Sequence, residues 1–174
     1  MKRALNILII LLILTFISGI VWFIYNPDKY ADTNIDSIVN ENFKVYPNYY
    51  TSSDSFTDTS SLALTAMKYY TLGNYQIAME TFRKYEPEPR YDGYYNLYAG
   101  ICFFKCGYTN VAIRHFDESV ESFNMFNDKT VARWYMSLAM LKANRIADSK
   151  EILNQLVNQN TIYKKKAQEI LKLL

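Results

Sequence analysis

The sequence predicts an all-α protein: an N-terminal transmembrane helix followed by a solenoid of three helical hairpins and a C-terminal capping helix. Two observations carry this prediction. Residues 4–24 form a run of 21 residues that contains no charged side chain and is mostly Leu, Ile, Phe and Val. Further along, small and aromatic residues recur about every 34 residues, the length of a helix–turn–helix unit. We therefore expect an anchor at residues 1–25, a linker at 26–59 and a helical domain at 60–174.

The apolar run is long enough to cross a bilayer, since its residues span roughly 32 Å as a helix at about 1.5 Å per residue. It is longer than the apolar core of a signal peptide, and no small-residue pair fits a cleavage point, so a retained anchor is favoured over a cleaved signal. Lys2 and Arg3 precede the run, while Asp28 and Asp32 follow it. The positive-inside rule then predicts a single-pass protein of the inner cell membrane, with a cytoplasmic N-terminus and an extracytoplasmic, periplasmic domain.

The charge balance argues against nucleic acid as a partner. The chain has 19 Lys plus Arg and 17 Asp plus Glu. Lys2 and Arg3 are the only charged residues before Asp28, so the rest of the chain carries 17 of each sign. A nucleic-acid-binding domain would need a basic face, which this balance does not indicate.

Few residues are suited to chemistry. Cys102 and Cys106 are too few for a disulfide scaffold and have no further Cys or His ligands for zinc, so we expect packed free thiols. The five glycines show no phosphate-loop spacing. His115, the single histidine, is expected at the surface of a helix. We predict no catalytic residue, cofactor or metal site, and do not expect an enzyme.

The linker is acidic and contains several tyrosines. Between Asp28 and Asp58 it holds six acidic residues against two lysines, so an anionic bilayer surface would repel it and the tether would project the domain. Residues 43–50, however, are too aromatic for an ordinary disordered spacer. Part of this stretch is expected to dock on the folded domain, with a fully solvated linker as the alternative.

A repeat becomes visible when Gly73 to Phe82 is aligned with Gly107 to Phe116 and then with Asn144 to Leu153. Three kinds of position recur: a small residue inside the first helix, a turn residue able to adopt a left-handed backbone, and a small residue in the second helix. In the three copies these are Ala66, Gly100 and Ser137, then Gly73, Gly107 and Asn144, then Ala78, Ala112 and Ser149.

These residues resemble the tetratricopeptide repeat (TPR), whose unit is a helix, a tight turn and a second helix. The resemblance implies hairpins at about 60–90, 92–127 and 129–159, followed by a capping helix at 161–174. The residues of this helix that can face the last pair are Ile162, Ala167, Ile170, Leu171 and Leu174. No proline closes the second pair, so its second helix is expected to run from Asn110 to Phe126. The order of anchor, linker, repeats and cap resembles membrane-anchored bacterial TPR proteins of unassigned function.

The resemblance also implies a concave groove formed by the first helices of successive pairs. We predict that its protein-binding residues are Met67, Tyr70, Tyr94, Phe104, Lys105, Trp134, Leu141 and Lys142. Several apolar members of this stripe could equally be core between helices. Because large apolar patches are rarely left exposed, a partner segment, the chain's own residues 43–50 or a second copy in a homo-oligomer should cover it.

The expected function is therefore that of a non-catalytic, membrane-anchored scaffold or adaptor, which binds a protein or peptide segment in this groove. The alternative is an accessory subunit of a membrane enzyme or transporter, contacting it through the anchor helix. Asn6, Thr15, Ser18 and Gly19 are the small and polar residues that such helix packing would use.

Overall fold

The computed structural model describes residues 15, 34–49, 61–84 and 93–174. The predicted anchor, apart from Thr15, lies outside the described residues, as do residues 26–33, 50–60 and 85–92. Within the described part of the chain, no helix is both long enough and apolar enough to cross a membrane. The chain divides into two compact units, Met1–Asn34 and Ile35–Leu174, and the second contains the repeats.

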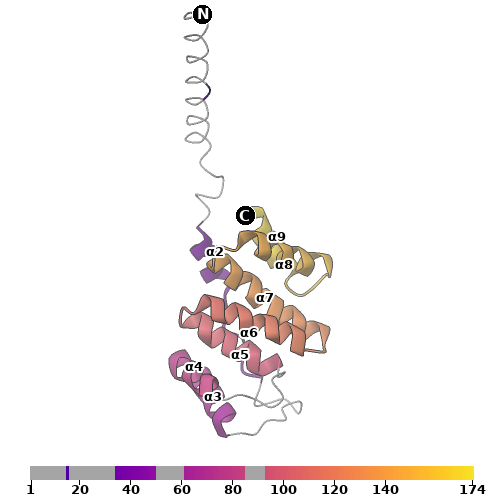
Figure 1. The fold of residues 1–174 in the computed structure, drawn as a ribbon. Helices are drawn as coiled ribbons and strands as arrows, with labels where there is room; N and C mark the ends of the chain where they lie inside the picture. The colour runs from indigo at the N-terminus through magenta and orange to yellow at the C-terminus, as the bar shows by residue number, and fades with distance from the viewer. Residues whose placement is uncertain (1–14, 16–33, 50–60, 85–92) are drawn as a thin grey trace, which may run out of the picture. The chain divides into compact units, whose positions relative to one another are not determined.

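The unit Ile35–Leu174 is all-α in its described residues, as predicted, and its helices pack as sequential hairpins (Figure 1). The first hairpin is α3 (Ser61–Thr71) with α4 (Tyr75–Lys84), and the second is α5 (Gly93–Lys105) with α6 (Thr109–Ser122). The third is α7 (Phe126–Lys142) with α8 (Ile146–Asn158), and α9 (Lys164–Leu173) packs on α8. A further helix, α2 (Ile35–Asn42), precedes them and packs against α7.

Equivalent positions of the three hairpins are buried alike. In the second helices, Ala78, Ala112 and Ser149 are fully buried, and so are Phe82, Phe116 and Leu153 one turn later. In the second hairpin, the small residue of the first helix is required by sterics, because a Cβ on Gly100 would lie 2.6 Å from the Phe116 ring. The aligned residues therefore form one continuous core through the stacked pairs.

The predicted turn residues adopt the left-handed backbone. The φ angles are +74° at Gly73, +85° at Gly107 and +58° at Asn144. Each residue follows its first helix and lets the chain reverse into the second, a conformation that is unstrained for Gly and tolerated by Asn. This prediction is confirmed at all three positions.

Two helix ends differ from expectation. The second helix of the middle pair stops at Ser122, not Phe126, because Phe123 takes an extended backbone (φ −72°, ψ 136°) and is buried with its ring 4.8 Å from that of Tyr94. At the capping helix, Thr161 is buried and its Oγ1 donates to the carbonyl of Leu156. The following turn leaves Ile162 78% exposed, so its expected packing on the last pair is wrong, whereas Ala167 and Ile170 of the capping helix are buried as expected.

Helix α2 was not expected at all, since residues 26–59 show no clear helical period. Its eight residues bury only Ile38 and Val39. Such a short segment is marginal as an isolated helix. Its stability comes from packing against α7, which is distant in sequence.

Candidate peptide-binding groove

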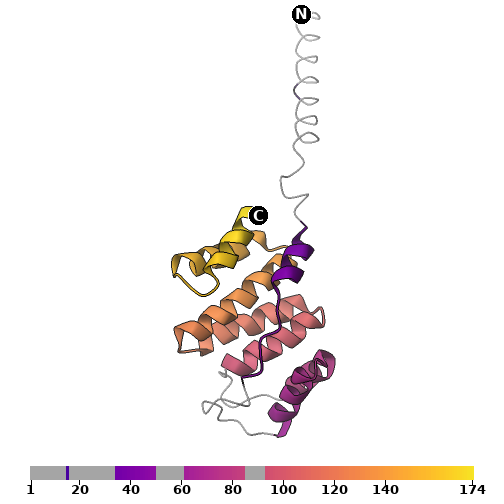
Figure 2. The same cartoon turned by 180° about the vertical axis from the view of Figure 1, so that it is seen from behind.

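Residues 43–49, which follow α2, run in an irregular, extended course along the first helices of the three hairpins (Figure 2). We call residues 43–49 the strap, and the sides of α3, α5 and α7 that contact it the first-helix face. The strap packs on the core through Phe43, Val45 and Tyr46, all of which are half-buried. The expectation that part of the aromatic linker docks on the domain is thus confirmed for the described residues.

Three tyrosine hydroxyls of the first-helix face hold the main chain of the strap. Tyr135 on α7 donates to the carbonyl of Lys44 at 2.5 Å. Tyr70 on α3 donates to the carbonyl of Tyr46 at 2.5 Å, and Tyr98 on α5 donates to that of Pro47 at 2.9 Å. The Tyr98 oxygen also accepts a hydrogen bond from the backbone N–H of Tyr49 at 3.0 Å. One tyrosine from each hairpin therefore binds backbone groups that any extended peptide would present.

Phe43 provides the side-chain anchor at the start of the strap. Its ring stacks on Phe104 of α5, with centroids 4.5 Å apart and planes inclined by 22°. It also meets the ring of Tyr135 edge-on at 5.3 Å. Aromatic pairs in these geometries contribute about 0.5–1.5 kcal/mol beyond their buried area. This slot between α5 and α7 is therefore selective for a flat side chain.

Polar contacts lie at the start of α2 and near the last residues of the strap. Lys142 of α7 forms an ion pair with Asp36 of α2, with Nζ and Oδ1 2.7 Å apart. Both side chains are largely exposed, so this pair contributes little to stability. At the other end, Asn48 donates from Nδ2 to Thr71 Oγ1 at 2.8 Å. The first-helix face thus contacts the segment from α2 to the last residues of the strap.

Burial keeps the tyrosine hydroxyls protonated. It raises the pKa of Tyr70 and of Tyr135 well above the ordinary value of 10.0, with neighbouring tyrosines adding to the effect. Burial also raises the pKa of Tyr46 in the strap, helped by the charge of Asp128. All three phenols therefore remain neutral hydrogen-bond donors throughout the physiological pH range.

Four of the eight predicted groove residues lie at the strap or beside it. Tyr70, Phe104 and Lys142 make the contacts described above. Lys105 lines a pocket of about 340 Å³ next to Phe43, together with Phe104 and Lys142. Its Nζ also lies 5.7 Å from the ring centroid of Tyr75. These four residues therefore lie along or beside the path of α2 and the strap.

The other four have different surroundings. Met67 and Leu141 are fully buried in the core. Trp134 is 2% exposed and stacks on Tyr163, just before α9, with centroids 4.7 Å apart and planes nearly parallel at 4°. Tyr94 is half-buried and packs against Phe123. In this conformation their side chains serve the packing between helices, which was the alternative interpretation of the apolar stripe.

Sequence reasoning missed two main groove residues, Tyr98 and Tyr135. A signal was available, because they are separated by the same offset in sequence that relates Gly107 to Asn144. They therefore occupy equivalent positions in the second and third hairpins. The apolar stripe from which the groove residues were predicted does not include this position.

The expectation that His115 lies at the surface is wrong. Its side chain is buried, with its ring stacked on Phe103 at 5.0 Å and its Nδ1 2.9 Å from Oδ1 of Asn96. Burial, followed by the charge of Arg114, lowers the pKa of His115 from 6.5 to about 4. Asn96 is 1% exposed and its Nδ2 has no hydrogen-bond partner. The histidine is therefore neutral at pH 7 and belongs to an incompletely satisfied polar pair.

The two cysteines are free thiols, with Cys102 buried and Cys106 half-buried. Burial raises the pKa of both, which makes them poor nucleophiles at neutral pH. Among the described residues, no group of three or more His, Cys, Asp or Glu side chains is placed to hold a metal ion.

Comparisons of this chain with models of protein families, with curated proteins and with solved structures gave no match. The contacts of the first-helix face with the strap are therefore the observations that bear on function.

Proposed function

We propose that this protein is a non-catalytic, membrane-anchored TPR scaffold whose first-helix face binds an extended segment of a partner protein on the extracytoplasmic side. The supporting observation is the set of three tyrosine hydroxyls that bind main-chain carbonyls of the strap. Main-chain hydrogen bonds give affinity for an extended peptide, and a side-chain slot gives selectivity. The strap occupies the site in the way that the partner segment would.

The chemistry of the strap suggests what the partner segment looks like. The Phe43 slot favours an aromatic side chain, and the hydroxyl of Tyr98 binds the carbonyl of a proline, which has no N–H of its own to satisfy. The exposed Lys142, which meets Asp36, favours a carboxylate several residues before the aromatic residue. The proposed partner segment is extended, with an acidic residue, an aromatic residue and a proline in that order.

The strap also sets the conditions for binding. A tethered occupant has an effective concentration on the order of millimolar, so a free segment must compete against it. Partner binding is therefore weak while the strap is in place and becomes measurable when the strap is weakened. This mutual exclusion makes the proposal testable with purified protein.

The test uses a fluorescent synthetic peptide with the sequence of residues 35–49, added to the full-length protein. Wild-type protein should bind it poorly, whereas a Phe43→Ala/Tyr46→Ala variant with a weakened strap should bind it measurably by fluorescence anisotropy. A peptide with the same Phe43→Ala change is the matched control and should bind at least several-fold more weakly. Absence of binding to a folded strap variant would contradict the proposal that the face accepts a segment in trans.

The partner itself can be sought by photo-crosslinking from position 104 in intact membranes. In wild-type protein the crosslink should form to the strap, because Phe104 stacks on Phe43. In the strap variant it should form to a second protein at a segment with the chemistry above. If the crosslinks stay within the chain in both proteins, the groove is not a recruitment site.

The alternative function is that of an accessory subunit that contacts a membrane enzyme or transporter through its anchor helix. The filled first-helix face favours this alternative, because a permanently closed groove leaves recognition to other parts of the chain. Replacing residues 4–24 with an unrelated hydrophobic helix separates the two functions. A scaffold keeps its partner after the exchange, whereas a subunit held by anchor packing loses it.

A further inference from the structure

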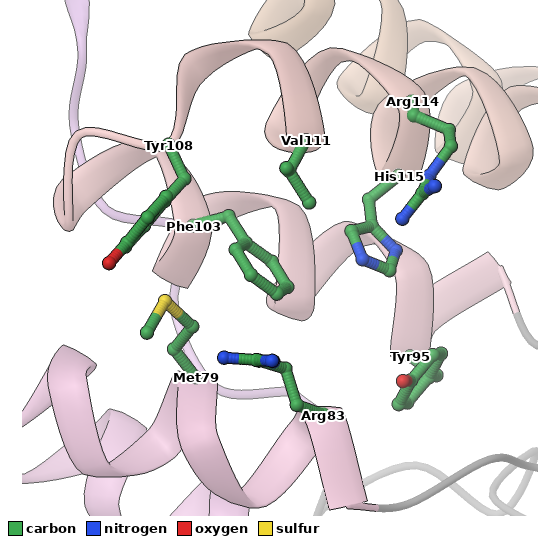
Figure 3. Close-up of a pocket in the computed structure, with 8 residues that line it drawn as sticks. All are labelled: Met79, Arg83, Tyr95, Phe103, Tyr108, Val111, Arg114 and His115. Carbon is green, nitrogen blue, oxygen red and sulfur yellow. The ribbon is translucent and has the colours of Figure 1, made fainter.

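A pocket of about 440 Å³ lies between α4 and α6, with α5 at its base (Figure 3). Its apolar lining comes from Met79, Phe103 and Val111, and its basic lining from Arg83, Arg114 and His115. None of its lining residues contacts the strap in the interactions described above. The volume is within the range of small-molecule binding sites.

The pocket has an excess of positive charge. Arg83 lines it from α4 and Arg114 from α6; the guanidinium group of Arg83 points toward Met79 and that of Arg114 lies beside His115 (Figure 3). Among the described residues, no Asp or Glu lines the pocket and none forms an ion pair with Arg83. The described acidic residue beside Arg114 is Glu118, with Nε and Oε1 3.8 Å apart and both side chains largely exposed, and Oε2 of the same Glu118 lies 3.8 Å from Nδ1 of His115. That long, exposed contact leaves Arg114 available to an anion.

The base of the pocket is flat and aromatic. The rings of Phe103 and His115 are parallel to within 14° with centroids 5.0 Å apart, and both side chains are almost fully buried. Tyr108 is half exposed at the rim, with its ring edge-on to Phe103 at 6.2 Å. A ligand in the pocket would therefore meet an aromatic surface formed by Phe103 and His115.

Behind this base, the His115–Asn96 pair is able to respond to a ligand. The hydrogen bond to Asn96 uses Nδ1 of the ring, so Nε2 remains for a ligand. Asn96 has an unpartnered, buried Nδ2. If its amide rotates by half a turn, Nδ2 donates to Nδ1 and the histidine carries its proton on Nε2 instead. The unsatisfied amide thus allows His115 to become a donor toward an anion.

We propose that this pocket binds a carboxylate attached to an aromatic or branched apolar group, with the side chains of Arg83 and Arg114 turning toward the carboxylate and Phe103 contacting the apolar part. Arginine is suited to the carboxylate because its planar fork matches the two oxygens. This chemistry is presented both by small apolar acids and by the C-terminal residue of a protein. The site is independent of the first-helix face and goes beyond the proposed function of the groove.

The test monitors the ring signals of His115 by NMR in full-length protein held in nanodiscs of neutral lipid. His115 is the single histidine of the chain, so its ring signals need no assignment by mutation. N-acetylphenylalanine should shift them with a dissociation constant on the order of 1 mM, as expected for a ligand of this size. N-acetylphenylalaninamide, which has the same ring but no charge, should cause at most a small shift.

Matched variants identify the contacts. Arg83→Gln and Arg114→Gln should each weaken binding by about tenfold, because each removes a charge-assisted hydrogen bond. Lys84→Gln is the control, since Lys84 is adjacent in sequence and exposed but does not line the pocket. Phe43→Ala, which loosens the strap, should leave the affinity unchanged and so separates this site from the groove.

An octapeptide ending in phenylalanine, with a free or an amidated C-terminus, distinguishes the source of the ligand. Tighter binding of the free-acid peptide than of N-acetylphenylalanine assigns the site to a protein C-terminus, and equal or weaker binding assigns it to a small acid. The proposal is overturned if acid and amide shift His115 equally, if neither does, or if Lys84→Gln weakens binding as much as Arg83→Gln.

Discussion

Individual tyrosines of the first-helix face bind the main chain of the strap through their hydroxyl groups. The chain contains 16 tyrosines, yet their roles differ with their positions. Tyr98 is fully buried and uses its oxygen both as donor to Pro47 and as acceptor from Tyr49, whereas Tyr108 is 51% exposed and makes no such bond. Tyr98 and Tyr108 have the same side chain, so their different roles follow from their burial and from the hydrogen-bond partners within reach.

This difference predicts the effect of removing one hydroxyl. Tyr98→Phe should lower the free energy of unfolding by about 1–2 kcal/mol, because it leaves the backbone groups of Pro47 and Tyr49 without this partner. Urea denaturation measures the change, and hydrogen exchange at the amide of Tyr49 should accelerate. Tyr108→Phe, the matched control, should stay within about 0.5 kcal/mol of wild type. Equal effects of the two variants would argue that the Tyr98 hydroxyl does not hold the strap.

His115 predicts a dependence of stability on pH. Its pKa is about 4 in the folded protein, below the ordinary value of 6.5, so the unfolded chain binds more protons between these two values. Stability is therefore complete above about pH 6.5 and is lost as the pH falls toward 4. Between pH 7 and pH 5 the loss from this group should be about 2 kcal/mol.

The measurement is urea denaturation of wild type and His115→Gln at both pH values. Glutamine does not titrate, so the variant should lose less stability on acidification by about that amount. Identical pH dependence in the two proteins would mean that His115 is accessible to protons in the folded state.

At the scale of helices, hairpin packing depends on matched pairs of small and large residues. Gly100 of α5 lies beneath the Phe116 ring of α6, and Gly93 lies beneath Phe123. A Cβ added at either glycine would collide with the aromatic ring packed against it. The aromatic ring of one helix therefore determines which residue the other can have.

Gly100→Ala should accordingly destabilise the protein by about 1–3 kcal/mol through overpacking, although alanine is the better helix former. Thermal or urea unfolding measures the loss. The double variant Gly100→Ala/Phe116→Leu should be more stable than the sum of the two single losses, because the smaller side chain makes room for the new methyl group. Strictly additive losses would mean that the two positions do not clash.

At the scale of the whole described unit, residues 35–49 complete the core. Ile38 and Val39 are 6% and 2% exposed against the repeats, and Phe43 packs between α5 and α7. Residues 35–49 therefore belong to the same compact unit as the repeats, Ile35–Leu174. The strap is part of the fold as well as the occupant of the groove.

A pair of truncations tests this. The fragment 35–174 coincides with a compact unit and should fold with a cooperative transition. The fragment 50–174 should be less stable by about 3 kcal/mol or more, because three apolar side chains lose their burial, only partly offset by the entropy regained by the released chain. Denaturant unfolding of both fragments provides the comparison. Equal midpoints would show that residues 35–49 contribute nothing to folding.

Prediction from sequence succeeded where the determinants are local. Gly73, Gly107 and Asn144 mark turns because few residues tolerate a left-handed backbone, and Ala78, Ala112 and Ser149 mark helix contacts because they are small. Prediction failed for helix α2, because its two buried apolar residues do not indicate a helix unless the packing against α7 is known. It also failed for the C-terminal end of α6. Half of the predicted groove residues face other helices, since an apolar stripe does not reveal which of several neighbours it meets.

By itself, the sequence determined the helical hairpins, their turns and the small residues between them, because these follow from backbone preferences and from contacts within one repeat. The tertiary structure decided what covers the first-helix face and that His115 is buried. The bonds that hold the strap join residues far apart in sequence, such as Tyr98 with Pro47 and Tyr135 with Lys44. No local pattern encodes such pairs; they form only when stacking of the hairpins brings one tyrosine from each to the same face.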